Sequence, residues 1–459
     1  MSGRRPTVLL AVTVAIAACW TAPATAQVAP GFEVPLLRGA ADDGTQAEDE
    51  AAVDFAVDEA ADELTELPVD DAGPPVEVED PYEPLGIRLG SFLLYPAIEA
   101  FLGYSNNVFD STTNPEGGGY YRVEPEAELL SDWSRHELRG FVSADHESFF
   151  DHSGETTTAF DAELEGRLDI SARDVAGLRL AYSIIPESRG DPNVPQSVVN
   201  PPDSEVAVAE ATYARRFGRF AVSVRGAAED FTYDDALLSD GTVVDNSDRD
   251  YRELNGGIRA GIGIDDDRRS IFVEAGANRR KYRRRFDDNG VERGSQGYDV
   301  LVGMTFDRGE PLSGEVAVGY QTQNPDDPNL PDIESVAFRG SLVWQPTGLT
   351  TFTLDGSIFP EESTLDPNAS GALVYSAGIG VEHSFRRNLI GSASFLYELS
   401  DYVGSPRVER DYLVVAGLEY LVNRRLSFQI DASYAKFESN IVGEDYDEAR
   451  VEAGIRLQR

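Results

Sequence analysis

The sequence predicts an all-β fold, a transmembrane antiparallel up-and-down β-barrel of about 18 strands. Three observations lead to this prediction. From Leu85 to Arg459, apolar and polar residues alternate with a period of two over many short segments. Turn residues separate these segments, and the connections between them alternate between short and long. Beyond residue 26 no apolar stretch reaches the roughly 18 residues of a membrane-spanning helix, whereas a barrel needs only alternate apolar residues.

Residues 1–26 have the features of a secretory signal peptide. Arg4 and Arg5 form a basic start, residues 8–18 are apolar, and Ala24-Thr25-Ala26 supplies the small residues of a cleavage site. The only cysteine, Cys19, ends a segment that resembles a lipoprotein box, so lipidation at Cys19 is the alternative to cleavage after Ala26. Either route exports the chain.

Residues 27–84 are predicted to form a disordered acidic tail. Between Asp42 and Glu83 the chain has 17 Asp or Glu residues and no Lys or Arg. Such a composition buries too little apolar surface to offset the entropy of ordering. We expect a solvated periplasmic tether. Docking to a periplasmic partner, or to peptidoglycan through bound cations, is the alternative.

The net charge of the chain is −42, which argues against nucleic acid as a partner. Of 39 cationic residues only Lys281 and Lys436 are lysine. This bias is typical of a GC-rich or salt-adapted genome, and arginine also suits bidentate pairing inside a polar lumen.

Residues 85–459 contain eighteen segments that fit strands. In 426–434, for example, Leu, Phe, Ile, Ala and Tyr alternate with Ser, Gln, Asp and Ser, a pattern that only a strand separates onto two faces. The predicted strands are 97–108, 119–131, 135–149, 157–170, 175–187, 204–216, 219–233, 251–264, 269–285, 298–306, 313–323, 334–345, 350–360, 371–383, 389–402, 409–422, 425–439 and 446–458.

The connections favour a membrane barrel over a soluble sandwich. Those after even-numbered strands are tight, such as 217–218 and 423–424, whereas those after odd-numbered strands are mostly long, such as 188–203 and 234–250. Outer-membrane barrels have short periplasmic turns and longer outer loops. With an even number of strands, the barrel also begins and ends in the periplasm, on the side of the acidic tail.

The same alternation predicts which face meets lipid. One face of each strand is apolar, and the opposite face carries the charges. A barrel of about 18 strands is wide enough for an aqueous path, so the charged face is predicted to line a lumen. Four candidate lumen residues are Arg225, Arg259, Arg339 and Asp431.

The segment 279–285 has six cations in seven residues. Strand register predicts that four point outward at the outer leaflet, where they would contact lipopolysaccharide phosphates, and that two point inward at the pore mouth. The alternative is pairing with the acidic loop 234–250. The outward four are Arg279, Lys281, Arg283 and Arg285, and the inward two are Arg280 and Arg284.

No enzymatic function is predicted. Only four histidines are present, and His146 falls on the predicted lipid face. The sequence has no nucleophile elbow, zinc-protease motif or glycine-rich phosphate loop, and no acidic run has calcium-loop spacing. We therefore expect no catalytic residues, no cofactor and no metal.

The stretch 89–96, Leu-Gly-Ser-Phe-Leu-Leu-Tyr-Pro, and the stretch 103–109, Gly-Tyr-Ser-Asn-Asn-Val-Phe, resemble the opening of the putative β-barrel porin 2 family of proteobacteria. The resemblance extends loosely to Arg459. It implies an outer-membrane barrel, and it associates some similar proteins with exopolysaccharide export. The chain departs from many such barrels because it ends in Gln458-Arg459 rather than in an aromatic residue.

Together these features predict a Gram-negative outer-membrane protein, a porin-like channel for hydrophilic solutes, with polysaccharide export as a narrower form of that function. The alternative is a non-conducting structural or surface-interaction barrel that binds partners through its acidic tail or loops. The expected partners are outer-membrane lipids and lipopolysaccharide, the barrel-assembly machinery and periplasmic export components.

Overall fold

The computed structural model describes residues 81–459 apart from 192, 196, 265–268 and 307–310. It also describes two short strands near the N-terminus, β1 (Val12–Thr13) and β2 (Arg38–Gly39), which pair with each other. Apart from these four residues and residues 81–84, the predicted signal peptide and acidic tail lie outside the described residues.

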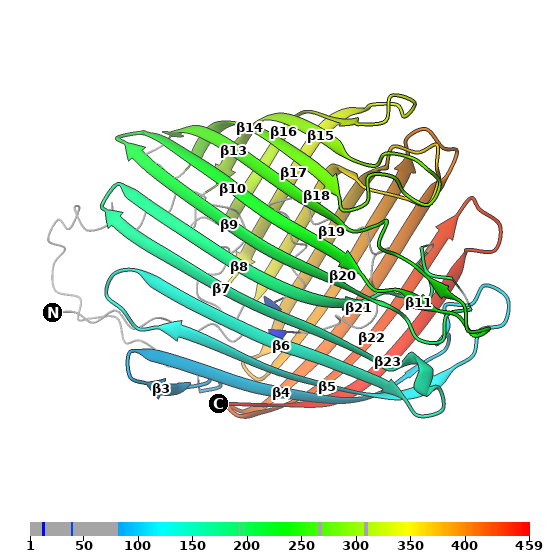
Figure 1. The fold of residues 1–459 in the computed structure, drawn as a ribbon. Coiled ribbons are helices and arrows are strands. Elements are labelled where there is room, and N and C mark those ends of the chain that lie inside the picture. The colour runs from blue at the N-terminus through cyan, green and yellow to red at the C-terminus, as the bar shows by residue number, and fades with distance from the viewer. Residues whose placement is uncertain are drawn as a thin grey trace, which may run out of the picture.

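Eighteen antiparallel strands close into one barrel (Figure 1). Each strand pairs with its neighbours in the chain, and β23 pairs with β4 to close the ring. The strands are β4 (Phe92–Ser105), β5 (Gly118–Ser131), β6 (Glu137–Phe149), β7 (Thr157–Ser171), β8 (Asp174–Pro186), β9 (Asp203–Phe217), β10 (Phe220–Tyr233), β13 (Tyr251–Ile264), β14 (Arg269–Tyr282), β15 (Ser295–Phe306), β16 (Leu312–Pro325), β17 (Ile333–Thr347), β18 (Thr350–Glu361), β19 (Ala372–Arg386), β20 (Leu389–Tyr402), β21 (Val408–Asn423), β22 (Leu426–Ser439) and β23 (Tyr446–Gln458).

The predicted fold class is confirmed, with eighteen barrel strands in the predicted order. The first strand begins at Phe92, five residues before the predicted start, and the ninth ends at Tyr282 rather than at 285. Within residues 85–459 the sequence pattern also missed three short strands. These are β3 (Ile87–Leu89), which turns onto β4 through Gly90 at a φ of 67°, and the loop hairpin of β11 (Ala236–Leu237) and β12 (Val243–Val244).

The barrel has two different ends. The short connections between successive barrel strands lie at the end where β4 begins and β23 ends, which we call the turn end, and the longer connections lie at the opposite loop end. The 3-10 turn η2 (Ser153–Glu155), the one helical element in the described part of the chain, belongs to a loop-end connection. Among the described residues no helix is long and apolar enough to span a membrane, a finding that does not bear on strands.

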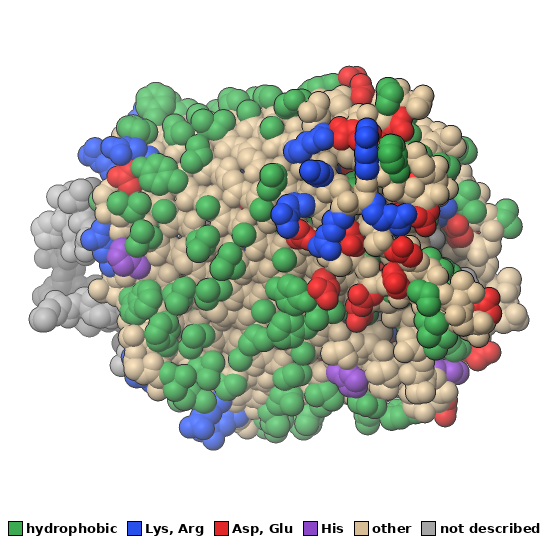
Figure 2. All heavy atoms as spheres, viewed as in Figure 1, with side chains coloured by type: hydrophobic (Ala, Val, Ile, Leu, Met, Phe, Trp, Pro, Cys, Tyr) green, Lys and Arg blue, Asp and Glu red, His purple; other side chains and the backbone are tan. Residues whose placement is uncertain are grey.

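The polarity of the barrel is inverted relative to that of a soluble protein. Large apolar side chains such as Leu178, Ile258 and Val300 are about half exposed on the outer face. Charged side chains such as Glu99 and Arg122 are almost fully buried on the inner face. Figure 2 shows apolar side chains spread over the middle of the outer surface. Such an outer surface requires an apolar solvent, which a lipid bilayer supplies.

Aromatic side chains border this apolar zone at both ends. Tyr104, Tyr298 and Tyr320 are about half exposed near the loop end, and Phe217 and Phe385 are similarly exposed near the turn end. On β21 the outward Tyr412 and Tyr420 are eight residues apart, which is about 27 Å along the strand and about 21 Å across a membrane at a 40° tilt. This spacing agrees with the roughly 25 Å apolar band and aromatic girdles of outer-membrane barrels.

Candidate functional site

The interior of the barrel holds the charged residues that the strand pattern assigned to it. Arg225, Arg259, Arg339 and Asp431 all lie on the inner face, as their positions in the strand registers require. Arg259 and Asp431 are only 5% and 4% exposed because neighbouring inner side chains pack around them. That these residues line a solute path stays a prediction.

An arginine network covers the inner face of β13–β17. Arg259 pairs with Glu274 at 2.6 Å and with Glu315 at 2.7 Å, and Arg339 reaches Glu274 at 3.1 Å. The Arg259 guanidinium also lies 4.0 Å from the centroid of the Phe272 ring. Hydrogen bonds between arginine and carboxylate are among the stronger ones in proteins. Because the two arginines pair with two glutamates, the charges in this part of the wall are largely balanced.

A second network joins the first strands of the barrel to the last one across the closing seam between β23 and β4. Arg122 on β5 contacts Glu452 on β23 at 2.5 Å, and Arg450 on β23 contacts Glu147 on β6 at 3.1 Å. Arg456 on β23 pairs with carboxylates of both β4 and β5. Apart from the contact of Arg456 with β4, these contacts pass over one or two strands, so side chains as well as backbone hydrogen bonds hold the seam closed.

The inner face of β18–β22 differs from the rest of the wall because its charged side chains are acidic. When the first and last residue of each strand are set aside, none of these five strands has a lysine or arginine on its inner face. Within the described part of the chain, Glu398, Asp411, Glu419 and Asp431 form no ion pair. We call the eight inward carboxylates of this region the acidic wall: Asp355, Glu361, Glu382, Glu398, Glu409, Asp411, Glu419 and Asp431.

The connection between β18 and β19 folds into the loop end of the barrel. Glu362 accepts hydrogen bonds from Arg280 Nη1 at 2.6 Å, from Ser295 Oγ at 3.0 Å and from Tyr282 Oη at 3.1 Å. Four strand spacings separate β14 from β18, about 19 Å along the wall. The connection must therefore leave the wall and cross part of the opening to make these contacts.

The connection between β8 and β9, residues 187–202, also folds inward. Gly190 packs against the Tyr446 ring so closely that a Cβ would have no room, although five strand spacings, about 24 Å, separate β8 from β23. Ser188 Oγ donates to Asp110 Oδ2 at 2.6 Å, and Arg249 pairs with Glu187 at 2.6 Å. Two inward connections thus narrow the loop end.

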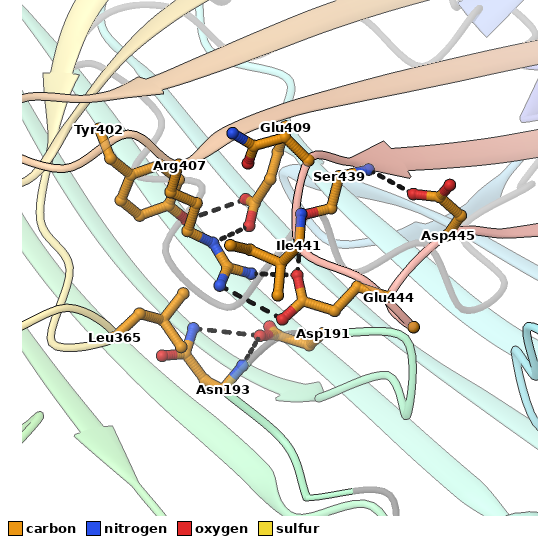
Figure 3. Close-up of polar contacts among 12 residues, drawn as sticks. Asp191, Asn193, Leu365, Tyr402, Arg407, Glu409, Ser439, Ile441, Glu444 and Asp445 are labelled. Carbon is orange, nitrogen blue, oxygen red and sulfur yellow. Dashed lines mark hydrogen bonds and ion pairs between the residues drawn. The ribbon is translucent and has the colours of Figure 1, made fainter.

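Arg407, just before β21, holds a third group of contacts at this level (Figure 3). It pairs with Glu409 and, at 2.6 Å, with Glu444 of the β22–β23 connection, while Tyr402 Oη donates to Glu409 at 2.9 Å. Figure 3 shows Asp191 and Leu365, from the two inward connections, beside this group. Glu409 is therefore an acidic-wall residue that an arginine neutralises.

The cations predicted to face outward, Arg279, Lys281, Arg283 and Arg285 (the outward cation cluster), lie at the loop end of β14 above the apolar zone (Figure 2). Strand register places Arg279 and Lys281 on the outer face, whereas Arg283 and Arg285 follow the last residue of the strand. Three members have acidic partners, which are Asp326 for Arg279, Asp230 and Asp250 for Arg283, and Glu292 for Arg285. Lys281 is exposed beside Arg252 on β13. Contact with lipopolysaccharide stays a prediction.

The two cations assigned to the pore mouth have different surroundings. Arg280 is 4% exposed on the inner face and is held between Glu253 at 2.5 Å and Glu362 at 2.6 Å. Arg284 lies beyond the end of β14, so strand register does not define its direction. Its side chain is 39% exposed and contacts Asp288 and Asp245, the latter in the acidic loop named above as an alternative partner.

Sequence reasoning missed the residues that narrow the loop end. Glu362, Arg407 and Gly190 lie in connections, where no period-two pattern applies. Among the described residues, no group of three or more His, Cys, Asp or Glu side chains is arranged to hold a metal ion. His146 lies on the outer face, with its ring nitrogen 2.9 Å from Thr158 Oγ1.

Comparison with known proteins places this barrel among porin-type proteins. A family model described as putative beta-barrel porin 2 matches residues 80–459. No curated protein matches the sequence.

Among solved structures, a BenF-like porin from Pseudomonas fluorescens Pf-5 aligns at 10% identity and a TM-score of 0.42, covering 81% of this chain and 100% of that one. The siderophore receptor PirA from Pseudomonas aeruginosa aligns at 9% identity and a TM-score of 0.39, covering 80% of each chain. OccK2 (OpdF) from P. aeruginosa, solved with glucuronate, aligns at 9% identity and a TM-score of 0.41, covering 81% of this chain and 99% of that one. Similarities this low give no basis for transferring a substrate.

Proposed function

Because the chain belongs to the putative β-barrel porin 2 family, we propose that it is a passive outer-membrane channel for small hydrophilic solutes. The observation that supports this most directly is the inverted polarity, with a charged interior inside an apolar outer surface. By the rule for outer-membrane barrels, the turn end faces the periplasm and the loop end faces the exterior. The two inward connections would then limit the size of solutes that enter from outside.

The interior also favours cations in this proposal. Arginines balance many carboxylates elsewhere on the wall, whereas four carboxylates of the acidic wall form no ion pair among the described residues. Unbalanced charge on a narrow wall of low dielectric attracts counter-ions and repels ions of the same sign. We therefore expect K⁺ to pass more readily than Cl⁻.

Single-channel recording tests both parts of the proposal. Purified protein in planar bilayers should give discrete conductance steps, and a KCl gradient should give a reversal potential of the sign expected for cation preference. Protein that inserts but shows no conductance would refute the channel and favour the non-conducting structural barrel. Conductance with anion preference would refute the role given to the acidic wall.

We propose passage of small solutes rather than polysaccharide export. The described residues offer no observation that favours a polymer over small solutes, and the inward connections favour small ones.

A further inference from the structure

Two carboxylates face each other on neighbouring strands of the acidic wall. Glu398 on β20 is the direct register partner of Asp411 on β21, and both side chains are on the inner face. In an antiparallel pair, directly opposed side chains have their Cβ atoms about 4.5–5.5 Å apart, and like charges at this distance repel each other. When both carboxylates are ionised, the arrangement is unfavourable unless a positive charge lies between or above them.

The described part of the protein supplies no such charge. Glu398 is 9% exposed and Asp411 is 6% exposed, and neither forms an ion pair there. Asp411 Oδ2 is buried and accepts no hydrogen bond. An unpaired buried carboxylate is costly, and elsewhere in this barrel the protein avoids that cost by placing an arginine beside the acid, as Arg259 does for Glu274.

The surroundings of the pair add to its negative potential. Asp191 of the inward β8–β9 connection and Glu409 both lie within electrostatic range of Asp411. Arg407 is already engaged by Glu409 and Glu444, so it is not placed to neutralise the pair. Further toward the turn end, Asp431 and Glu419 continue the same wall without ion pairs among the described residues.

We propose that the Glu398–Asp411 pair is a binding site for organic cations bearing ammonium or guanidinium groups. The inference rests on the proposed channel function, since the solute must reach the barrel interior. An ammonium has three donors and a guanidinium has five, so either can bridge two carboxylates. A polyamine is the best fit, because its further ammonium groups could meet Asp431 and Glu419.

A metal ion is the less suitable occupant. Calcium takes six to eight oxygen ligands, and the described residues form no group of three or more side chains arranged for a metal. Two opposed carboxylates alone fall short of that number.

The test uses spermidine and the full protein folded in lipid. Spermidine should reduce the K⁺ current in a concentration-dependent way, and the double variant Glu398→Gln with Asp411→Asn should need about tenfold more spermidine or higher for the same block. Asp401→Asn is the matched control, because Asp401 is an exposed acid on the outer face of the same strand. It should leave the block unchanged.

Titration calorimetry of spermidine with detergent-solubilised protein separates this inference from the channel proposal. If the protein does not conduct, the channel proposal fails, yet spermidine binding that the double variant loses still supports the site. Equal block or equal binding in the double variant and the control would overturn the site, as would binding of Ca²⁺ without binding of spermidine. The double variant should fold, since it removes a repulsion, and its heat-dependent gel mobility will verify this.

Discussion

Replacing Arg122 by Gln should destabilise the folded barrel by about 3–5 kcal/mol, the usual effect of breaking a buried ion pair. The Arg122 side chain is 1% exposed and contacts Glu452 at 2.5 Å and both Glu124 and Asp145 at 3.2 Å. At an effective dielectric constant of about 20, one such contact is worth roughly 5 kcal/mol of attraction. Desolvation and repulsion among the three carboxylates offset much of the sum, which gives the range stated.

Urea-induced unfolding in phospholipid vesicles, followed by tryptophan fluorescence and by gel mobility, measures this change. The matched control is Arg88→Gln, because Arg88 pairs with Asp132 at 2.6 Å while its side chain is 60% exposed. Exposed pairs contribute about 0–1 kcal/mol, so the control should stay close to wild type. If Arg122→Gln loses less than about 1 kcal/mol, or no more than the control, the interior ion pairs are not the stabilising contacts described here.

Three further predictions concern the loop end and the wall. Glutamine at all four positions of the outward cation cluster should reduce co-purifying lipopolysaccharide phosphate, since basic groups near an anionic surface contribute about 1 kcal/mol each, and unchanged phosphate would refute the contact. Burial and the nearby Glu448 raise the pKa of Asp110 to about 7. The folded state thus holds this proton more tightly than the unfolded chain, so the free energy of unfolding should fall as the pH rises from about 4 to about 7. Asp110→Asn should remove this contribution to the pH dependence of the urea midpoint of unfolding. Gly319→Ala should cost about 1–3 kcal/mol because its Cβ would collide with the Val300 carbonyl. Gly226→Ala should have little effect on unfolding, because its Cβ would meet only the Asn255 carbonyl, at an ordinary contact distance of 4.0 Å.

The strands were predictable because one face of each strand is apolar and faces outward, while the other is polar and faces the barrel interior. On β22, Phe428 and Ile430 face outward while Gln429 and Asp431 face inward, so the sequence records the direction of each side chain directly. The inner-face assignment of Arg259 follows from the same period. Lengths were predictable where a tight turn ends the ladder, as between β9 and β10.

The connections were not predictable because tertiary contacts alone determine their course. β14 ends at Tyr282 although cations continue to Arg285, and the hydrogen bond from Arg283 N to the Asp250 carbonyl is a last contact in the ladder register before the chain enters the loop. Likewise, nothing near Glu362 in the sequence indicates that its partner is Arg280, 82 residues away. The absence of arginine from the acidic wall could have been predicted from the sequence, because the period-two pattern identifies the inner-face residues of these five strands and of the other barrel strands.

The arrangement of charges across the seam has a consequence for how the ring is completed during biogenesis. The acids Glu99, Glu126 and Glu147 belong to the first three strands made, and the arginines that neutralise them, Arg450 and Arg456, belong to the last. Until β23 arrives, the open edge repels its own side chains, and a chain truncated before Tyr446 lacks the cations that would relieve this. Completion of synthesis and closure of the ring are therefore coupled by charge, independently of any terminal aromatic signal.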